Sequence, residues 1–247
     1  MKIIISPAKK MNVDTDTFAH ANLPVFLSRT EELMNYIKSL SFSEAKKLWG
    51  CNDKIAEQNF KRYAEMDLER FLTPAIISYE GIQYQYMSPM VLSENGLNYV
   101  QKHLRILSGF YGILKPFDGV TPYRLEMQAK ASIGNFKDLY EYWGDSLYQE
   151  LISDDDHVIL NLASKEYSKC IEKHLSEQDL FVTCVFGELI DGKVVQKGTL
   201  AKMARGEMVR FLAENQINTP EGVKNFQGLG YSFSERFSNE REYVFIK

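Results

Sequence analysis

The sequence contains only three cysteines among 247 residues, and it has no long apolar run. A helix that spans a membrane needs roughly 20 consecutive apolar residues, and no stretch of this chain approaches that length. The apolar segment near the N-terminus is also too short for a secretion signal. Three scattered cysteines do not form a disulfide framework, which agrees with a reducing compartment. We therefore expect a cytoplasmic protein that does not partner a membrane.

Complete catalytic and metal-binding signatures are also absent. The sequence has no nucleophile elbow, HExxH motif, CxxC pair, dinucleotide-binding glycine fingerprint or P-loop. Cys170 and His174 would share a helix face at i, i+4, but no close pair supplies the remaining ligands of a metal site. We therefore expect no metal and no cofactor. Enzymatic activity stays open, and a non-enzymatic role is favoured.

The chain also carries no excess of positive charge, because its formal net charge is −4. This value argues against a protein whose whole surface attracts nucleic acid. Much of the negative charge lies in blocks typical of solvated turns, above all Asp154 to Asp156. Basic residues in the rest of the sequence are therefore less compensated by acidic residues than the net charge implies. A local basic cleft is compatible with this composition.

Apolar residues recur at helical spacing in five segments. We predict helices over residues 28–40, 55–66, 93–108, 137–151 and 199–219. Ser28 with Glu31 and Ser41 with Glu44 match capping boxes, and Thr199 is a candidate N-cap. The helix that begins after Ser93 is predicted to run on to Ser108.

Short apolar segments between the helices predict strands over residues 2–5, 75–79, 157–163, 181–190, 193–197, 231–233 and 243–245. Asp191-Gly192 is the strongest hairpin signal in the chain. Helices and strands are interspersed without a linker or repeat. We therefore predict an α/β fold of mixed α+β type, with one compact domain over residues 1–247 and a mixed sheet surrounded by helices.

Polar side chains lie at the ends of many of these elements, and most of them favour anions. Arginine forks suit phosphate, lysines supply point charges, and Asn and Ser add neutral hydrogen bonds. The predicted DNA- or phosphate-binding residues are Lys9, Lys10, Arg105, Lys115, Arg124, Asn161, Ser164, Lys202 and Arg205. The stretch from His103 to Met127, rich in Gly and Pro, is predicted to form one wall of an anion-binding cleft, with Lys9, Asn161 and Lys202 opposite.

Two further residues of this stretch are catalytic candidates. Glu126 is a possible acid or base, and Tyr123 could stack on a base.

Six ordered blocks of the sequence resemble the bacterial YaaA family, which is linked to the response to peroxide. The blocks are SPAK (6–9), LRILSGFYGILKPFDGVTPYRLEM (104–127), KDLYEYWG (137–144), NLASKEYSK (161–169), ARGEMVRFLAEN (204–215) and GYSF (230–233). The resemblance implies a family-specific mixed fold with a positively charged cleft and a helix-hairpin-helix-like element that binds duplex or distorted DNA. It also implies a role in limiting damage when peroxide meets intracellular iron.

We place the helix-hairpin-helix-like element on Leu104 to Arg124. A familiar hairpin of this kind carries Gly-x-Gly, whereas Gly109 and Gly112 are spaced as Gly-x-x-Gly.

Three hypotheses follow. The first is a cytoplasmic DNA-binding protein of the peroxide stress response, with sequence-tolerant binding through phosphate contacts. The second is an enzyme that processes a nucleotide or nucleobase in an anion-binding cleft. The third is an iron-handling or protein-interaction role without DNA contact.

Overall fold

Apolar segments from distant parts of the chain pair as the parallel centre of a mixed sheet. The computed structural model describes residues 1–247. Its parallel strands are β5 (Leu104–Ser108), β1 (Lys2–Ile5), β8 (Val158–Leu162), β9 (Leu180–Ile190) and β12 (Glu242–Ile246), in that spatial order. Antiparallel strands complete the sheet, namely β6 (Gly112–Leu114) beside β5, β11 (Ser232–Phe233) beside β12, and β10 (Lys193–Val195) beside β9. β1 lies between β5 and β8 in the sheet. All four of its residues are buried, as in strands covered on both faces.

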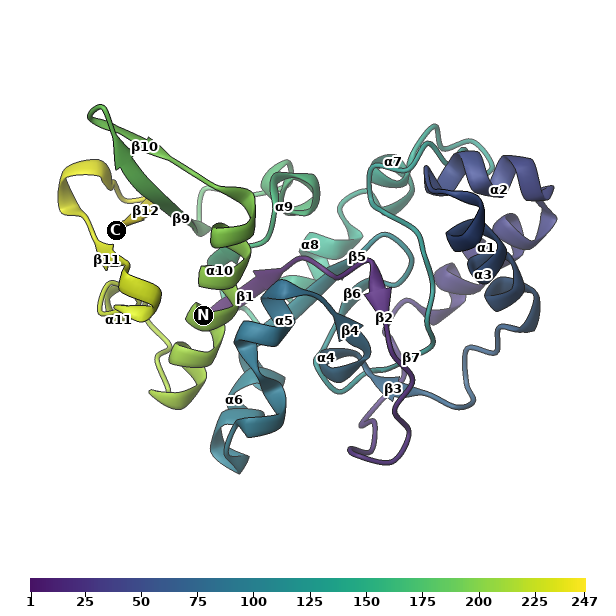
Figure 1. Ribbon diagram of the computed structural model, residues 1–247, viewed down its shortest axis with the longest axis horizontal. Helices are drawn as coiled ribbons and strands as arrows, with labels where there is room; N and C mark the ends of the chain where they lie inside the picture. Colours follow the sequence, from purple (N-terminus) through teal and green to yellow (C-terminus); the bar gives the residue numbers. More distant parts are fainter.

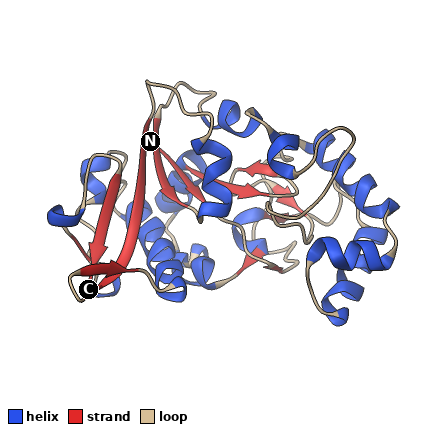
Figure 2. Cartoon of the chain, turned by 90° about the horizontal axis from the view of Figure 1, so that it is seen from above, coloured by secondary structure: helices blue, strands red, loops and turns tan.

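Helices cover the sheet and extend the molecule at one end. α10 (Gly198–Glu214) packs on α5 (Ile82–Met87) and α6 (Glu94–His103), and α8 (Ser146–Leu151) packs on α9 (Lys165–Glu172). Figures 1 and 2 show a separate group of helices at the end of the molecule opposite β9 and β12. This group consists of α1 (Leu27–Ser39), α2 (Phe42–Trp49) and α3 (Asp53–Glu65).

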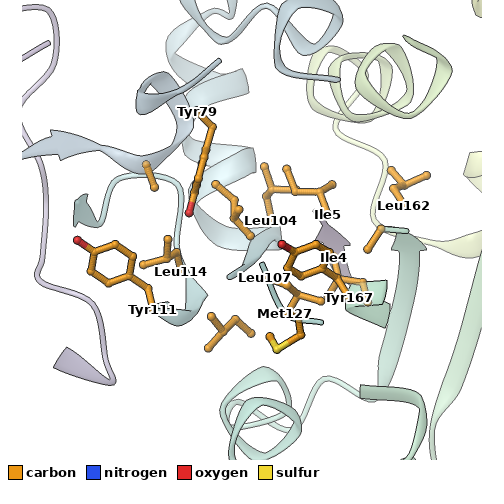
Figure 3. Packing of buried hydrophobic residues seen from close by; sticks show 14 of the residues in the cluster. Ile4, Ile5, Tyr79, Leu104, Leu107, Tyr111, Leu114, Met127, Leu162 and Tyr167 are labelled. Atoms are coloured by element: carbon orange, nitrogen blue, oxygen red, sulfur yellow. The ribbon is translucent and has the colours of Figure 1, made fainter. Parts of the chain in front are cut away.

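The remaining elements are short. They are α4 (Ala75–Ser78), α7 (Leu139–Trp143), α11 (Pro220–Val223), and the paired strands β2 (Lys10–Met11) with β4 (Tyr79–Glu80) and β3 (Thr73–Pro74) with β7 (Gly119–Val120). One continuous cluster of 62 buried residues forms the core. Figure 3 shows Ile4, Leu107 and Leu162 from β1, β5 and β8 within it. No helix combines the length and apolar character needed to cross a membrane.

Much of the predicted order is confirmed. The fold is α/β with a mixed sheet surrounded by helices, and the Asp191-Gly192 hairpin joins β9 to β10 with φ of 49° and 75°. Both turn residues have positive φ, as a type I′ turn requires. Ser41 and Glu44 form the predicted capping box of α2, and Ser93 caps α6.

The prediction of a helix running to Ser108 was wrong. α6 ends at His103, and all five residues of Leu104–Ser108 are buried in β5. A strand buried on both faces has no alternation, so its leucines also matched helical spacing. The helix-hairpin-helix-like element placed on Leu104 to Arg124 is wrong for the same reason, because this segment forms β5, β6 and β7.

Four local predictions also need correction. The helix over 137–151 is broken into α7 and α8 at Gly144, whose φ of 54° and ψ of −132° lie outside the helical region. Residues 75–78 form α4 rather than a strand. The N-cap positions of α1 and α10 are Phe26 and Lys197, so Ser28 and Thr199 lie inside their helices.

Candidate functional site

A cavity of about 400 Å³ opens where the parallel strands β1 and β8 end. It is lined by five segments, residues 6–10, 80–84, 123–126, 164–167 without 165, and Lys202 with Arg205. We call it the strand-end cavity. Ligands of α/β proteins commonly bind outside the carboxyl ends of parallel strands, so its position alone makes it the first candidate site.

Ser6 fixes the floor of this cavity by joining the two strand ends. Its hydroxyl accepts a hydrogen bond from the backbone N–H of Ser164 at 2.8 Å and donates to the Ser164 hydroxyl at 3.2 Å. Tyr84 donates its hydroxyl to the Ser6 carbonyl at 3.0 Å. Ser164 occupies the N-cap position of α9, but its side chain makes no capping hydrogen bond. Its hydroxyl therefore belongs to the floor.

Close backbone packing at two glycines sets the positions of two walls. A Cβ atom on Gly109 would lie 2.5 Å from the Leu125 carbonyl oxygen, and one on Gly206 would lie 2.1 Å from the Gln83 carbonyl oxygen. Any side chain at these positions would overlap backbone. Gly109 thereby seats the Arg124–Glu126 wall on the β5–β6 turn, and Gly206 seats α10 on α5.

One wall of the strand-end cavity carries cations that already have partners. Glu126 contacts Lys9 at 2.9 Å and Arg124 at 3.0 Å, and Lys10 contacts Glu80 at 2.6 Å. Glu126 and the Arg124 side chain are only 19% and 12% exposed, so this pair is partly shielded from water. Glu126 thus lies between two cations.

The α10 wall carries cations without carboxylate partners. Neither Lys202 nor Arg205 forms an ion pair, and the buried Nε of Arg205 has no hydrogen-bond partner. Burial lowers the pKa of Arg205 from its ordinary value. A guanidinium that is partly buried without a counter-charge is costly unless an anion binds it. Lys202 and Arg205, three residues apart on α10, therefore provide the strongest anion-binding position in the cavity.

Glu166 adds a carboxyl group that sequence reasoning missed. Burial raises its pKa above the ordinary value, and the nearby charge of Glu126 acts in the same direction. One of its oxygens accepts the backbone N–H of Gln128 at 3.2 Å. Its only sequence signal was its position two residues after Ser164, in the first turn of α9. A carboxyl of this kind is suited to exchanging a proton with a bound ligand.

Tyr123 is held inside an aromatic cluster. Ser108 accepts the N–H groups of Phe110 and Tyr111, so its hydroxyl donates to Tyr123 at 2.7 Å, and the hydroxyls of Tyr123 and Tyr79 share a hydrogen bond of 2.8 Å. The Tyr123 ring stacks on Phe110 with centroids 4.9 Å apart and is 5% exposed. Burial raises the pKa of Tyr123 to about 12. The ring therefore offers no open face for the base stacking that we predicted.

Three of the predicted binding residues lie elsewhere. Asn161 is buried and bonds Thr183 and the N–H of Ala163, which ties the ends of β8 and β9 together. Arg105 lies on strand β5 and lines a second cavity of about 260 Å³ with Lys115 and Asp118. The predicted cleft is thus reduced to Lys9, Lys10, Arg124, Ser164, Lys202 and Arg205, with Glu126 among them.

A larger hollow of about 770 Å³ adjoins the strand-end cavity, with which it shares Lys9, Arg124 and Glu126. It runs along α1 and α2 and adds Lys47 and Lys130 to the lining, so we call it the α2 groove. The two hollows together are lined by seven cationic residues, Lys9, Lys10, Lys47, Arg124, Lys130, Lys202 and Arg205, and four acidic ones, Glu44, Glu80, Glu126 and Glu166. Their local balance is positive, opposite to the net charge of −4 of the whole chain.

The family model described as peroxide stress protein YaaA matches residues 1–237. The chain belongs to this family.

Its relatives in the YaaA family match along nearly their whole length. A UPF0246 protein of Agathobacter rectalis is 59% identical over 245 residues, covering 99% of this chain and 98% of the relative. A UPF0246 protein of Lachnoclostridium phytofermentans is 58% identical over 247 residues, covering 100% and 96%. Another from Desulfitobacterium hafniense is 54% identical over 247 residues, covering 100% and 98%. Membership of the YaaA family supports a role in peroxide stress.

No group of three or more His, Cys, Asp or Glu residues in this YaaA-family chain is arranged to hold a metal ion. The chemistry visible in the strand-end cavity is that of unpaired cations, a partly buried carboxyl group and the hydroxyl groups of Ser6 and Ser164 at two strand ends.

Proposed function

We propose that the chain is a cytoplasmic DNA-binding protein of the peroxide stress response, which limits DNA damage linked to intracellular iron. DNA would lie along the α2 groove and the mouth of the strand-end cavity. The observation that carries the proposal is the α10 wall, where Lys202 and Arg205 have no carboxylate partner although they line a hollow of positive balance. A phosphate would supply the counter-charge that Arg205 lacks.

The character of the binding follows from the kind of contacts. Lysine and arginine contacts to phosphates are independent of base sequence, and each neutralised phosphate releases counterions. With about four phosphates neutralised, affinity is expected to fall about 100-fold between about 50 and about 200 mM salt.

The test is a fluorescence anisotropy titration of unrelated duplex DNAs with the wild-type protein and the Arg205→Ala variant. We expect Arg205→Ala to weaken binding about tenfold for every sequence and to reduce the salt slope by about one unit. Lys193→Ala is the matched control, because Lys193 is an exposed lysine on the β9–β10 hairpin outside both hollows. Affinity that does not change with salt, or an equal loss in Lys193→Ala, would refute DNA binding through this surface.

A second candidate function is an enzyme that processes a nucleotide or a nucleobase. It is favoured by the raised pKa of Glu166, beside Glu126, in a cavity that also has an unpaired arginine. Incubation of concentrated protein with nucleosides, nucleotides and damaged DNA should then yield a product, and Glu126→Gln should abolish turnover while binding is retained. The absence of any product from wild-type protein would remove this candidate.

A further inference from the structure

The strand-end cavity and the α2 groove differ in more than size. The α2 groove is larger and is bordered by exposed lysines, whereas the smaller cavity is lined by the unpaired Arg205 together with Ser6 and Ser164 at the ends of β1 and β8. Contacts to a phosphate backbone do not require such a pocket. We propose that the strand-end cavity holds a single nucleoside 5′-phosphate, with its phosphate at Lys202 and Arg205 and its base beside Glu166.

The volume and the lining fit one nucleotide. About 400 Å³ is near the lower end of the range for small-ligand sites, which are lined by apolar groups with a few placed polar ones. Ile82, Leu125 and the largely buried rings of Tyr84 and Tyr167 supply apolar surface. The Tyr84 hydroxyl is already bonded to Ser6, so this ring is held in place. A flat base can pack against such fixed walls.

The polar groups of the cavity are of two kinds, cations that suit a phosphate and a carboxyl group that suits a base. At α10 the cavity presents positive charge that no carboxylate neutralises, which matches a phosphate dianion. Elsewhere in the lining it presents the Glu166 carboxyl group, of which only one oxygen is bonded to Gln128. A carboxylate accepts a hydrogen bond from a base amino group, and a protonated carboxyl donates to a ring nitrogen or carbonyl. Inorganic phosphate would satisfy only the α10 end.

The nucleotide could arrive from two sources. Because the cavity shares Lys9, Arg124 and Glu126 with the α2 groove, a nucleotide turned out of DNA lying in the groove could enter it. That source rests on the proposed function. A free mononucleotide is the other source and would bind whether or not the chain binds DNA.

The first arm of the test is calorimetric titration of the full chain with a deoxynucleoside 5′-monophosphate, the matching nucleoside and inorganic phosphate. We expect the monophosphate to bind at least about tenfold more tightly than either of the others, and Arg205→Ala to lose that advantage. Arg205→Lys should restore part of it, since a point charge replaces the fork. Equal affinities for monophosphate and inorganic phosphate would overturn the proposal, because they would show an anion site alone.

The second arm uses duplex DNA that carries 2-aminopurine, with anisotropy recorded in the same titration. We expect its fluorescence to rise on binding to the wild-type protein. Ile82→Trp fills the cavity and leaves the cations unchanged, so it should abolish the rise while anisotropy still reports DNA binding. Circular dichroism and the thermal midpoint confirm that this variant is folded.

The two arms separate the outcomes. DNA binding with a fluorescence rise supports entry of an extruded nucleotide. DNA binding without a rise, together with tight monophosphate binding, supports the cavity site and assigns it to free nucleotides. DNA binding with neither signal overturns this inference and leaves the proposed function standing. Monophosphate binding without DNA binding supports this inference and overturns the proposed function.

Discussion

Two arginines line two hollows of the same sheet, and their surroundings are opposite in kind. Arg105, on β5, is 7% exposed and donates from one nitrogen to the carbonyl oxygens of Leu104, Lys102 and Gln101. It shares its hollow with Asp118 and Glu150. Arg205, on α10, has no ion pair and a buried Nε without a partner. One guanidinium is satisfied by its own chain, whereas the other is left available for a ligand.

The difference distinguishes a cation that stabilises the fold from a cation that is available to bind a ligand. Removal of a partnered buried charge leaves its acceptors unsatisfied, so the cost falls on stability. Removal of an unpartnered charge relieves a desolvation cost, so the loss falls on ligand affinity. Three substitutions test whether the Arg105 hollow contributes to stability and the Arg205 hollow to ligand affinity.

Arg105→Ala should have the largest effect. It leaves carbonyl oxygens without a donor and removes one of the two positive charges near Asp118, so the free energy of unfolding should fall by about 3 kcal/mol. Urea denaturation measures the loss. DNA affinity of the folded variant should stay within about twofold of wild type. A variant of normal stability that binds DNA poorly would move Arg105 into the binding surface and break the comparison.

Gly206→Ala should have an intermediate effect on stability and, unlike Arg105→Ala, should also weaken binding. The new Cβ would overlap the Gln83 carbonyl oxygen, so α10 must move away from α5 and carry Arg205 with it. Overpacking of this kind costs about 2 kcal/mol, partly offset by the higher helix propensity of alanine. Denaturation and DNA titration on the same sample measure both losses. Gly198→Ala is the control, because its Cβ would meet nothing within 4 Å.

Asp118→Asn should not destabilise the chain, and its effect should be visible only as a function of pH. Burial raises the pKa of Asp118 from 3.8 to about 6, so the folded chain holds its proton more tightly than the unfolded chain. The contribution of this group to stability is therefore present below about pH 4 and is lost as pH rises through about 6. Asparagine never ionises and still accepts the Lys115 N–H that Asp118 accepts at 2.8 Å.

Above pH 6 the variant should accordingly be more stable than wild type by up to about 3 kcal/mol, and at pH 4 the two should be equally stable. Thermal melts at several pH values provide the measurement. A constant difference at all pH values would show that Asp118 has the same pKa in the folded and unfolded chains, so that the cations of the Arg105 hollow offset its burial.

Local chemistry was sufficient to predict the elements that depend on a few neighbouring residues. Asp191-Gly192 specifies its own turn, and Ser41 with Glu44 caps α2 without help from the rest of the chain. Helical spacing alone puts Lys202 and Arg205 near one face of α10, and both line the strand-end cavity. Their meeting with Lys9 and Arg124 was also expected, since SPAK follows a strand and strand ends gather ligands.

The remaining errors concern residues whose environment is determined by distant parts of the chain. Arg105 looked like a binding residue because nothing nearby in the sequence reveals that β5 pairs with β1 and buries it. Glu166 was overlooked because its raised pKa comes from burial and from Glu126, forty residues earlier in the chain. The predicted helix over 137–151 ran through Gly144, whereas the backbone of this glycine adopts a conformation that side chains resist.

The five segments around the strand-end cavity are scattered along the chain between Ser6 and Arg205. They meet only when β1, β5 and β8 have paired and α10 has docked, so shorter folding intermediates contain no binding site. A ligand of this cavity must therefore recognise the native state alone and stabilise it by mass action, by about 2.7 kcal/mol at one hundred times its dissociation constant. Occupancy would then protect even segments far from the cavity against proteolysis, wherever their exposure requires the whole domain to unfold.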